Sequence, residues 1–214
     1  MEVQLITPPV TSFLQVKLDS EIVDHLWQII ENGKSQNINV KNKLAGNISH
    51  SFLLNDIGSY VYKNVCIPLV KFYRERDPKG FDPVSINSLL GAKTTLVLNE
   101  IWVNYQYQTE FNPFHDHSGV YSFAIWLKIP YDSAEQQKLS QFNGIKQENK
   151  KAGNFEFEYI DSLGEVRTYG YPLSSRLEGT MLFFPAKLRH CVYPFYGTDQ
   201  PRISISGNLF YTSL

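Results

Sequence analysis

The sequence predicts a mainly β protein of the jelly-roll type, a double-stranded β-helix, with N-terminal helices packed on the sheet. From about residue 94 onward, β-branched and aromatic residues recur in short runs separated by turn signals, with no long helical pattern between them. Aromatic residues make up 14% of the chain, a high share that suits a sandwich or barrel. The first third instead carries helical patterns, which explains why helices are expected beside the sheet.

The N-terminal third predicts one strand followed by two helices. Residues 13–18 alternate like an edge strand, and apolar residues at helical spacing then follow the expected N-cap Ser20. A second helix should begin at residues 55–56 and close at residues 77–80. Because Pro68 lacks a backbone N–H, we expect it to kink this second helix.

The remaining two thirds predict a set of strands that would bring the total to about eight. These runs are residues 95–107, 120–129, 155–159, 166–169, 180–184, 191–193 and 202–211. Residues 133–154 are polar and read as a long exposed loop, which is either a binding loop or a solvated insertion. We expect a single domain over residues 1–214, in which residues 1–93 support a jelly-roll core over residues 94–214.

Composition and charge exclude several classes of function. The formal net charge is -1, which argues against general nucleic-acid binding because that function needs a basic face. No segment reaches the roughly 18 apolar residues of a membrane span, and the N-terminus lacks the basic start of a signal peptide. The two cysteines, Cys66 and Cys191, are too few for a disulfide framework. We therefore expect a cytoplasmic protein with reduced thiols and no nucleic-acid or membrane partner.

Three histidines could form a metal site. His115 and His117 are two residues apart, so on an extended chain their imidazoles point to the same side. Gly119 lets the backbone pass close by without a side chain. His190 follows an apolar strand and a turn at Pro185, which could aim a third imidazole into the same barrel. A lone histidine is more often structural, but the upstream pair reverses those odds here.

The stretch from Arg202 to Ser206 alternates strictly between polar and apolar residues. One interpretation turns Arg202 to solvent, since half-buried strands usually present their apolar side to the core. The other places Arg202 inside a polar barrel, where a buried guanidinium needs an anionic partner. In that case Arg202 and Ser204 would clamp a carboxylate through a bidentate guanidinium and a hydroxyl donor.

Together, these elements resemble the iron(II)- and 2-oxoglutarate-dependent oxygenases, whose jelly roll is cupin-like. The resemblance is nearest to their small prolyl-hydroxylase-like group of bacteria and phages. It rests on His115-x-His117, on Phe184-Pro185 before His190, and on Arg202-x-Ser204. It implies Fe(II) held by the three histidines and 2-oxoglutarate held by Arg202 and Ser204. The implied activity is that of a dioxygenase, an oxidoreductase that hydroxylates its substrate.

The sequence departs from the superfamily at His117, where a carboxylate is expected. A three-histidine site could hold Fe(II), or Asp116 could supply the carboxylate with one histidine displaced. Alternation favours the three-histidine site, because Asp116 should point away from the side shared by His115 and His117. Neutral ligands would leave the iron with one more positive charge, which should alter its redox potential and its hold on 2-oxoglutarate.

The remaining expectations concern supporting residues and partners. Asn104 lies on one face of its strand, and Tyr105 and Tyr107 lie on the other, so either face could contact 2-oxoglutarate. The family that the chain resembles often uses a tyrosine on this strand for the co-substrate, so the resemblance favours Tyr105 or Tyr107. His50 should lie in a loop and receives no role. A small-molecule or peptide substrate is expected, its identity is not readable, and a homodimer is compatible with the sequence. The competing hypotheses are a three-histidine cupin-type metalloenzyme that does not use 2-oxoglutarate and a non-catalytic jelly-roll binding protein.

Overall fold

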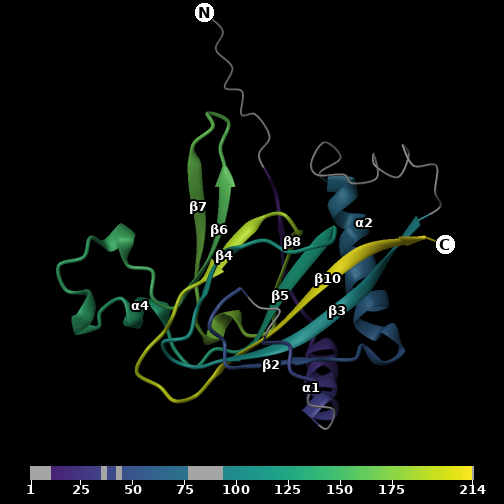
Figure 1. Cartoon of the computed structure of the whole chain (residues 1–214), viewed down its shortest axis with the longest axis horizontal. Helices are drawn as coiled ribbons and strands as arrows, with labels where there is room; N and C mark the ends of the chain where they lie inside the picture. The colour runs from purple at the N-terminus through teal and green to yellow at the C-terminus, as the bar shows by residue number, and fades with distance from the viewer. Residues whose placement is uncertain (1–10, 35–37, 42–44, 77–93, 214) are drawn as a thin grey trace, which may run out of the picture.

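A computed structural model describes residues 11–34, 38–41, 45–76 and 94–213 of the 214-residue chain. It shows two antiparallel sheets that face each other, with helices on the outer side of the larger sheet (Figure 1). The mainly β jelly roll with N-terminal helices is therefore confirmed. No helix in the described ranges is long and apolar enough to cross a membrane.

Within the described residues, the larger sheet has six strands, in the order β1-β8-β5-β10-β3-β2. Their bounds are β1 Leu14–Lys17, β2 His50–Leu53, β3 Thr94–Gln106, β5 Tyr121–Lys128, β8 Thr180–Pro185 and β10 Arg202–Ser213. The expectation that His50 lies in a loop is wrong, because His50 begins β2 and pairs with Tyr105 of β3. This short strand carries no alternation strong enough to stand out in the sequence.

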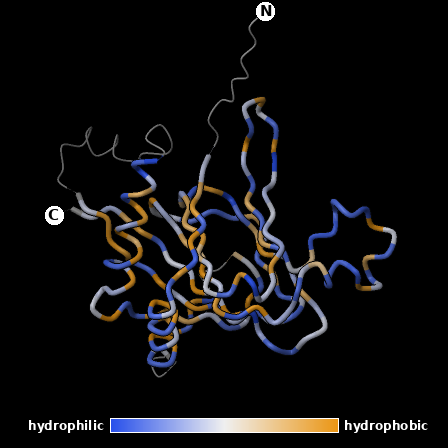
Figure 2. The backbone as a smooth tube through the Cα atoms, turned by 180° about the vertical axis from the view of Figure 1, so that it is seen from behind, coloured by the Kyte–Doolittle hydropathy of each residue, from blue (hydrophilic) through white to orange (hydrophobic). Residues whose placement is uncertain are grey.

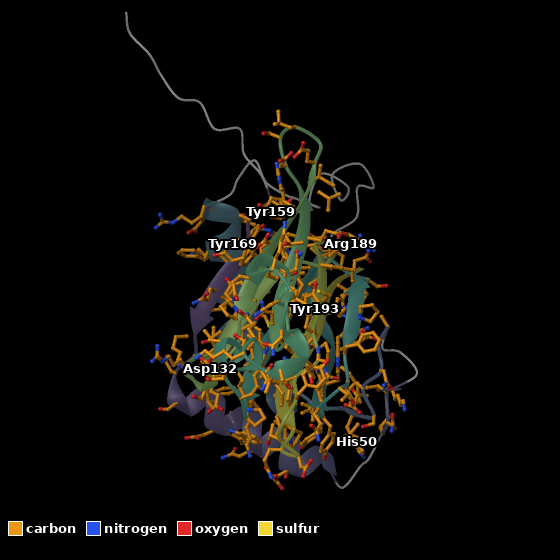
Figure 3. All side chains as sticks on the ribbon, turned by 90° about the vertical axis from the view of Figure 1, so that its left-hand side faces the viewer. His50, Asp132, Tyr159, Tyr169, Arg189 and Tyr193 are labelled. Carbon is orange, nitrogen blue, oxygen red and sulfur yellow. The ribbon has the colours of Figure 1, made fainter. Side chains whose placement is uncertain are left out.

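In the part of the chain that the structure describes, the smaller sheet has four strands, in the order β4-β9-β6-β7. Their bounds are β4 Asn112–His115, β6 Asn154–Ile160, β7 Val166–Pro172 and β9 Arg189–Val192. The hairpin formed by β6 and β7, which carries Tyr159 and Tyr169, projects beyond the rest of the sheet (Figure 3). The sheet thus combines an exposed hairpin with the short pair β4 and β9.

Helices α1 (Ser20–Lys34) and α2 (Ile67–Arg76) cover one face of the larger sheet (Figure 1). The second helical segment is less regular than expected. It comprises a 3₁₀ turn at Ile57–Ser59, a π-helical turn at Tyr62–Cys66 and then α2, so the irregularity lies just before Pro68. Its expected end at residues 77–80 lies outside the described residues.

Residues 133–154 form a lobe beside the barrel, as the sequence suggested. It contains α4 (Ser133–Gln136) and two 3₁₀ turns, Ser140–Phe142 and Gln147–Asn149, and its residues are mostly hydrophilic (Figure 2). The lobe is anchored where the Gln136 side chain makes two hydrogen bonds, of 2.9 and 2.7 Å, to the backbone of Tyr196. Short helical turns therefore occur within the long exposed loop that its composition predicts.

The two faces of β10 decide where the site lies. Ile203, Ile205 and Leu209 pack into the apolar core under the helices. The alternate residues of β10 point between the two sheets and line a cavity; they are Arg202, Ser204, Ser206 and Asn208. Because both faces of this sheet are covered, the polar face of β10 faces a cavity between the sheets instead of bulk water.

Candidate metal centre

A cavity of about 330 Å³ lies between the two sheets. One wall consists of four matched residue pairs from β3 and β10, and all eight residues line the cavity. We call these pairs rungs one to four: Gln106 and Arg202, Asn104 and Ser204, Trp102 and Ser206, and Glu100 and Asn208. The three histidines singled out in the sequence line the same cavity, so the fold brings both candidate groups into one space.

Two short strands and one connecting segment position the histidines. His115 ends β4 and pairs directly with His190 of β9, while His117 lies just beyond β4. The ligand nitrogen atoms of the three side chains lie within 4.8 Å of one another. The segment that follows His117 turns at Gly119, whose φ is +101° and where a Cβ would lie 2.7 Å from the Leu209 carbonyl oxygen.

Backbone carbonyl groups fix the tautomers of two of these rings. His115 Nδ1 lies 2.8 Å from the Pro113 oxygen, and His190 Nδ1 lies 3.1 Å from the Leu188 oxygen. Since a carbonyl oxygen only accepts, each Nδ1 carries the proton and donates it. Each Nε2 is therefore unprotonated, in the arrangement that metal-ligating histidines commonly adopt. The His115 Nε2 accepts a hydrogen bond from Asn112 Nδ2 at 3.2 Å, and a metal would take the place of this donor.

The spacing of the rings suits a shared cation. His117 Nε2 and His190 Nε2 are 3.2 Å apart. Two imidazole nitrogens bound to one ion at about 2.1 Å lie roughly 3.0–3.4 Å apart for bond angles between octahedral and tetrahedral. The Nε2 lone pair of His190 faces His117, and a cation between the two nitrogens would satisfy both.

Burial keeps the three rings neutral near pH 7. It lowers the pKa of His117 to about 4 and that of His190 well below its ordinary value, and neighbouring histidines add to both shifts. Burial also lowers the pKa of His115, although hydrogen bonding to the Pro113 carbonyl opposes the shift. Neutral imidazole is the form that binds a metal, so protons do not compete strongly at this pH.

Asp116 does not join the histidines. Its carboxylate lies 2.9 Å from Lys187 Nζ in an exposed ion pair. Among the described residues, the group able to hold a metal consists of His115, His117 and His190. The structure thus arranges three neutral nitrogen donors, the first of the two arrangements that the sequence left open.

Arg202 forms the closed end of the cavity and is only 2% exposed. It donates one hydrogen bond to the Tyr131 hydroxyl and one to Gln106 Oε1, both neutral acceptors. Its guanidinium carbon lies 5.9 Å from the ring centres of Tyr131 and Phe195, whose rings stack on each other. No described carboxylate lies within ion-pair distance, and a buried guanidinium in this setting calls for an anionic ligand.

Neighbouring amides hold this end in one arrangement. Gln106 Nε2 donates to the Glu110 carbonyl at 2.6 Å, and its Oε1 accepts from Arg202, so the amide orientation is fixed. On the second rung, Asn104 Oδ1 accepts from Ser51 Oγ at 2.8 Å. Asn104 and Ser204 form the rung between Arg202 and Trp102, whose ring stacks on His117, so a ligand held by both the guanidinium and the histidines would pass this rung.

The fold does not bring the predicted residues Tyr105 and Tyr107 to the cavity. Tyr105 lies on the opposite face of β3 and packs edge-on against Phe52, while Tyr107 packs against His50. The tyrosine beside Arg202 is instead Tyr131, which sequence reasoning missed. Tyr131 follows β5 in an irregular segment, and its contact with Arg202 spans 71 residues, so no local pattern marks it.

Comparison with known proteins gives a family and a fold. The family described as "Putative 2OG-Fe(II) oxygenase" matches residues 100–208, slightly more than half of the chain. A viral collagen prolyl hydroxylase from Paramecium Bursaria Chlorella virus-1 superposes with a TM-score of 0.51 at 12% identity, covering 92% of this chain and 94% of its own. A Pseudomonas putida prolyl-4-hydroxylase gives 0.49 at 12% identity, with 92% and 91% covered.

No curated protein matches the chain by sequence. The viral structure shares the jelly-roll fold, which agrees with the two facing sheets described above. The matched segment begins at rung four on β3 and ends at rung four on β10, so it contains the whole cavity wall and all three histidines. The chain belongs to the 2OG-Fe(II) oxygenase family and is a 2-oxoglutarate-dependent oxygenase that requires Fe(II).

Proposed function

We propose that His115, His117 and His190 hold the iron, and that Arg202 and Ser204 hold the distal carboxylate of 2-oxoglutarate. The observation that carries this proposal is the buried Arg202, which has only neutral partners and lies in the same cavity as the three histidines. A metalloenzyme that did not use an acidic co-substrate would leave this guanidinium without an anion. The cavity therefore supports the diacid over the alternative chemistries.

Tyr131 and Asn104 complete the proposed acid site. The Tyr131 hydroxyl accepts from Arg202 and donates to the Gly153 carbonyl at 2.9 Å, so it fixes the depth of the guanidinium. Gly153 has to be glycine, because a Cβ there would lie 2.7 Å from the Tyr131 ring. Asn104 lies on the rung between Arg202 and the metal group and is placed to contact the body of the acid.

When bound, iron and 2-oxoglutarate supply the oxidation that places an oxygen atom of O₂ on a substrate carbon, with succinate and CO₂ as co-products. The chain's own residues orient these partners and exclude water. Arg202 orients the acid through charge, and the apolar side chains of Phe155, Phe184 and Trp126 limit water around the rings. The Pro113 and Leu188 carbonyls hold two histidines in the metal-binding tautomer.

The proposed substrate is an amino-acid side chain in a peptide, with a prolyl residue as the first candidate. The solved structures that share this fold include prolyl hydroxylases, and the sequence pattern resembles their group. The mouth of the cavity, where Asp116 and Ser118 are exposed, leaves room for a chain segment to approach the histidines.

Succinate release tests the proposal. Purified wild-type protein with Fe(II), ascorbate, O₂ and 2-oxoglutarate should release succinate, and His190→Ala and Arg202→Ala should each reduce the release to background. His50→Ala is a matched control, because His50 lies on β2 outside the cavity. Succinate release that persisted unchanged in both cavity variants would refute the proposed roles of His190 and Arg202.

A further inference from the structure

The fourth rung of the cavity wall carries a charge opposite to that of the first. Glu100 pairs with Asn208 three rungs away from Arg202, and both residues line the cavity. Asn208 lies six residue steps from Arg202 along the extended strand, which corresponds to about 20 Å. The cavity therefore has a guanidinium at one end and a carboxylate toward the other.

The histidine group lies between these two charges. The Trp102 ring on rung three stacks on His117, with ring centres 5.8 Å apart at 26°. A diacid that reaches from Arg202 to the histidines would occupy rungs one to three and would not need rung four. Glu100 therefore stands beyond the metal group as seen from Arg202.

Burial shows from which side a substrate arrives. Arg202 and Gln106 are each 2% exposed, whereas Asp116 and Ser118, which line the same cavity, are exposed and Glu100 is half-buried. The cavity is closed at rung one and opens beyond the histidines. A substrate that reaches the metal group from the mouth passes Glu100.

The Glu100 carboxylate is held by buried polar groups. Asn208 Nδ2 donates to Glu100 Oε2 at 3.2 Å, and Ser122 Oγ donates to Asn208 Oδ1 at 2.7 Å. Asn208 is 4% exposed and Ser122 is 1% exposed, so this chain of hydrogen bonds lies inside the protein. Because a carboxylate offers roughly four acceptor positions, it can accept from a substrate donor as well as from its protein partners. Glu100 is thus an anion that the fold positions along the path of the substrate.

We infer that Glu100 determines substrate specificity and that the substrate carries a protonated amino or guanidinium group beside the carbon that is oxidised. This inference rests on the proposed function and narrows its peptide substrates to those with Lys or Arg at or next to the reacting residue. A half-buried carboxylate attracts cations more strongly than one in water, and it repels acidic side chains. Guanidinium and ammonium groups are its natural partners.

Binding of small peptide mimics tests the inference without turnover. The probes are Nα-acetyl N-methylamides of lysine, arginine, norleucine and glutamate, titrated calorimetrically into the anaerobic Fe(II) and 2-oxoglutarate complex. We expect the lysine and arginine probes to bind about tenfold more tightly than the norleucine probe, a difference of about 1.4 kcal/mol. Glu100→Gln should remove this preference, and Glu100→Lys should transfer it to the glutamate probe.

Two controls distinguish a failure of the inference about Glu100 from a failure of the proposed function. Glu165→Gln makes the same charge change on a 58% exposed carboxylate of the hairpin, and it should keep the preference. Titration of 2-oxoglutarate into wild-type protein with Fe(II) is performed first, and absence of binding there would refute the proposed function. Normal 2-oxoglutarate binding without a cation preference, or a preference that survives in Glu100→Gln, would overturn the inference alone. The inference also fails if Glu100→Gln weakens the binding of 2-oxoglutarate as much as that of the lysine probe.

Discussion

The two ends of the cavity are built by different structural means. At the closed end, Arg202 and Gln106 face each other across β10 and β3, two strands that stay in register over the four rungs. At the histidine end, β4 and β9 are only four residues long and their register shifts between Asn112 and His115. His117 lies beyond β4 altogether. The acid end thus depends on strand register, and the metal end depends on local loop geometry.

Because the two ends are built differently, we expect a substitution at one end to leave the other end intact. His190→Ala removes the most buried of the three rings and should abolish Fe(II) binding while leaving the Arg202 network in place. This is the largest expected effect, because two remaining histidines make an incomplete site. Iron content after desalting measures it, with thermal melting of the metal-free protein as the control for folding. Stoichiometric iron in this variant would show that His190 is structural.

The second largest effect is expected at the other end. Arg202→Ala should raise the Kd for 2-oxoglutarate by about a hundredfold, in line with the roughly 3 kcal/mol of a charge-assisted buried contact. Fe(II) affinity should change little. Arg202→Lys should recover only part of the loss, since an ammonium lacks the planar fork of guanidinium. Calorimetry on both variants checks this, and a parallel loss of iron would contradict separate ends.

Acid should destabilise the metal-free protein through the histidine end. The folded state keeps His117 neutral down to about pH 4, whereas the unfolded chain takes up a proton near the ordinary histidine pKa of 6.5. The unfolded state therefore binds more protons as the pH falls from 6.5 to 4, and stability drops by up to about 1.4 kcal/mol per pH unit for each such ring. Urea melts across this range measure the effect. A His117→Gln variant should show a shallower fall of stability with decreasing pH. An identical fall would show that His117 is not the source of the acid sensitivity.

A smaller effect should follow from loosening the clamp around Arg202. Tyr131→Phe deletes the hydroxyl that accepts from Arg202 and donates to Gly153, while keeping the stacked ring. We expect the KM for 2-oxoglutarate to rise about fivefold with kcat nearly unchanged, since a single hydrogen bond contributes about 1 kcal/mol. Steady-state kinetics provide the measurement. A collapse of kcat instead would place Tyr131 in the chemistry itself.

The smallest effect is expected at the exposed ion pair. Asp116→Asn removes a carboxylate that pairs with Lys187 and does not belong to the histidine group. Fe(II) affinity should stay within about twofold, because exposed ion pairs contribute between 0 and about 1 kcal/mol. Competition with a chelator of known affinity measures this. A large loss of iron would identify Asp116 as a ligand and reverse the choice between the two arrangements.

Sequence reasoning worked best where one local rule decides the outcome. The two-residue period of a strand places Arg202 and Ser204 on one face together, and the core demands that Ile203 and Ile205 face the helices. Which face of β10 lines a polar cavity depends on tertiary structure. The sequence alone left that choice open, and it is decided by how the two sheets pack face to face.

Other features could not be predicted from the sequence, for physical reasons. The prediction of Tyr105 or Tyr107 chose the wrong face of β3, because the inward set 104 and 106 is fixed only by pairing with β10. Tyr131 meets Arg202 across 71 residues from an irregular segment, and no periodicity predicts such a contact. β2 is four residues long and begins with His50, so it lacks the length that makes a strand visible in a sequence.

The most direct test of separate ends is a two-by-two binding measurement. Fe(II) content and 2-oxoglutarate affinity are determined anaerobically for wild type, His190→Ala and Arg202→Ala. The structure predicts one iron per chain in wild type and Arg202→Ala and none in His190→Ala. It also predicts tight 2-oxoglutarate binding in iron-loaded wild type and at least a tenfold weaker Kd in Arg202→Ala. Full iron in His190→Ala, or an unchanged 2-oxoglutarate Kd in Arg202→Ala, would contradict it.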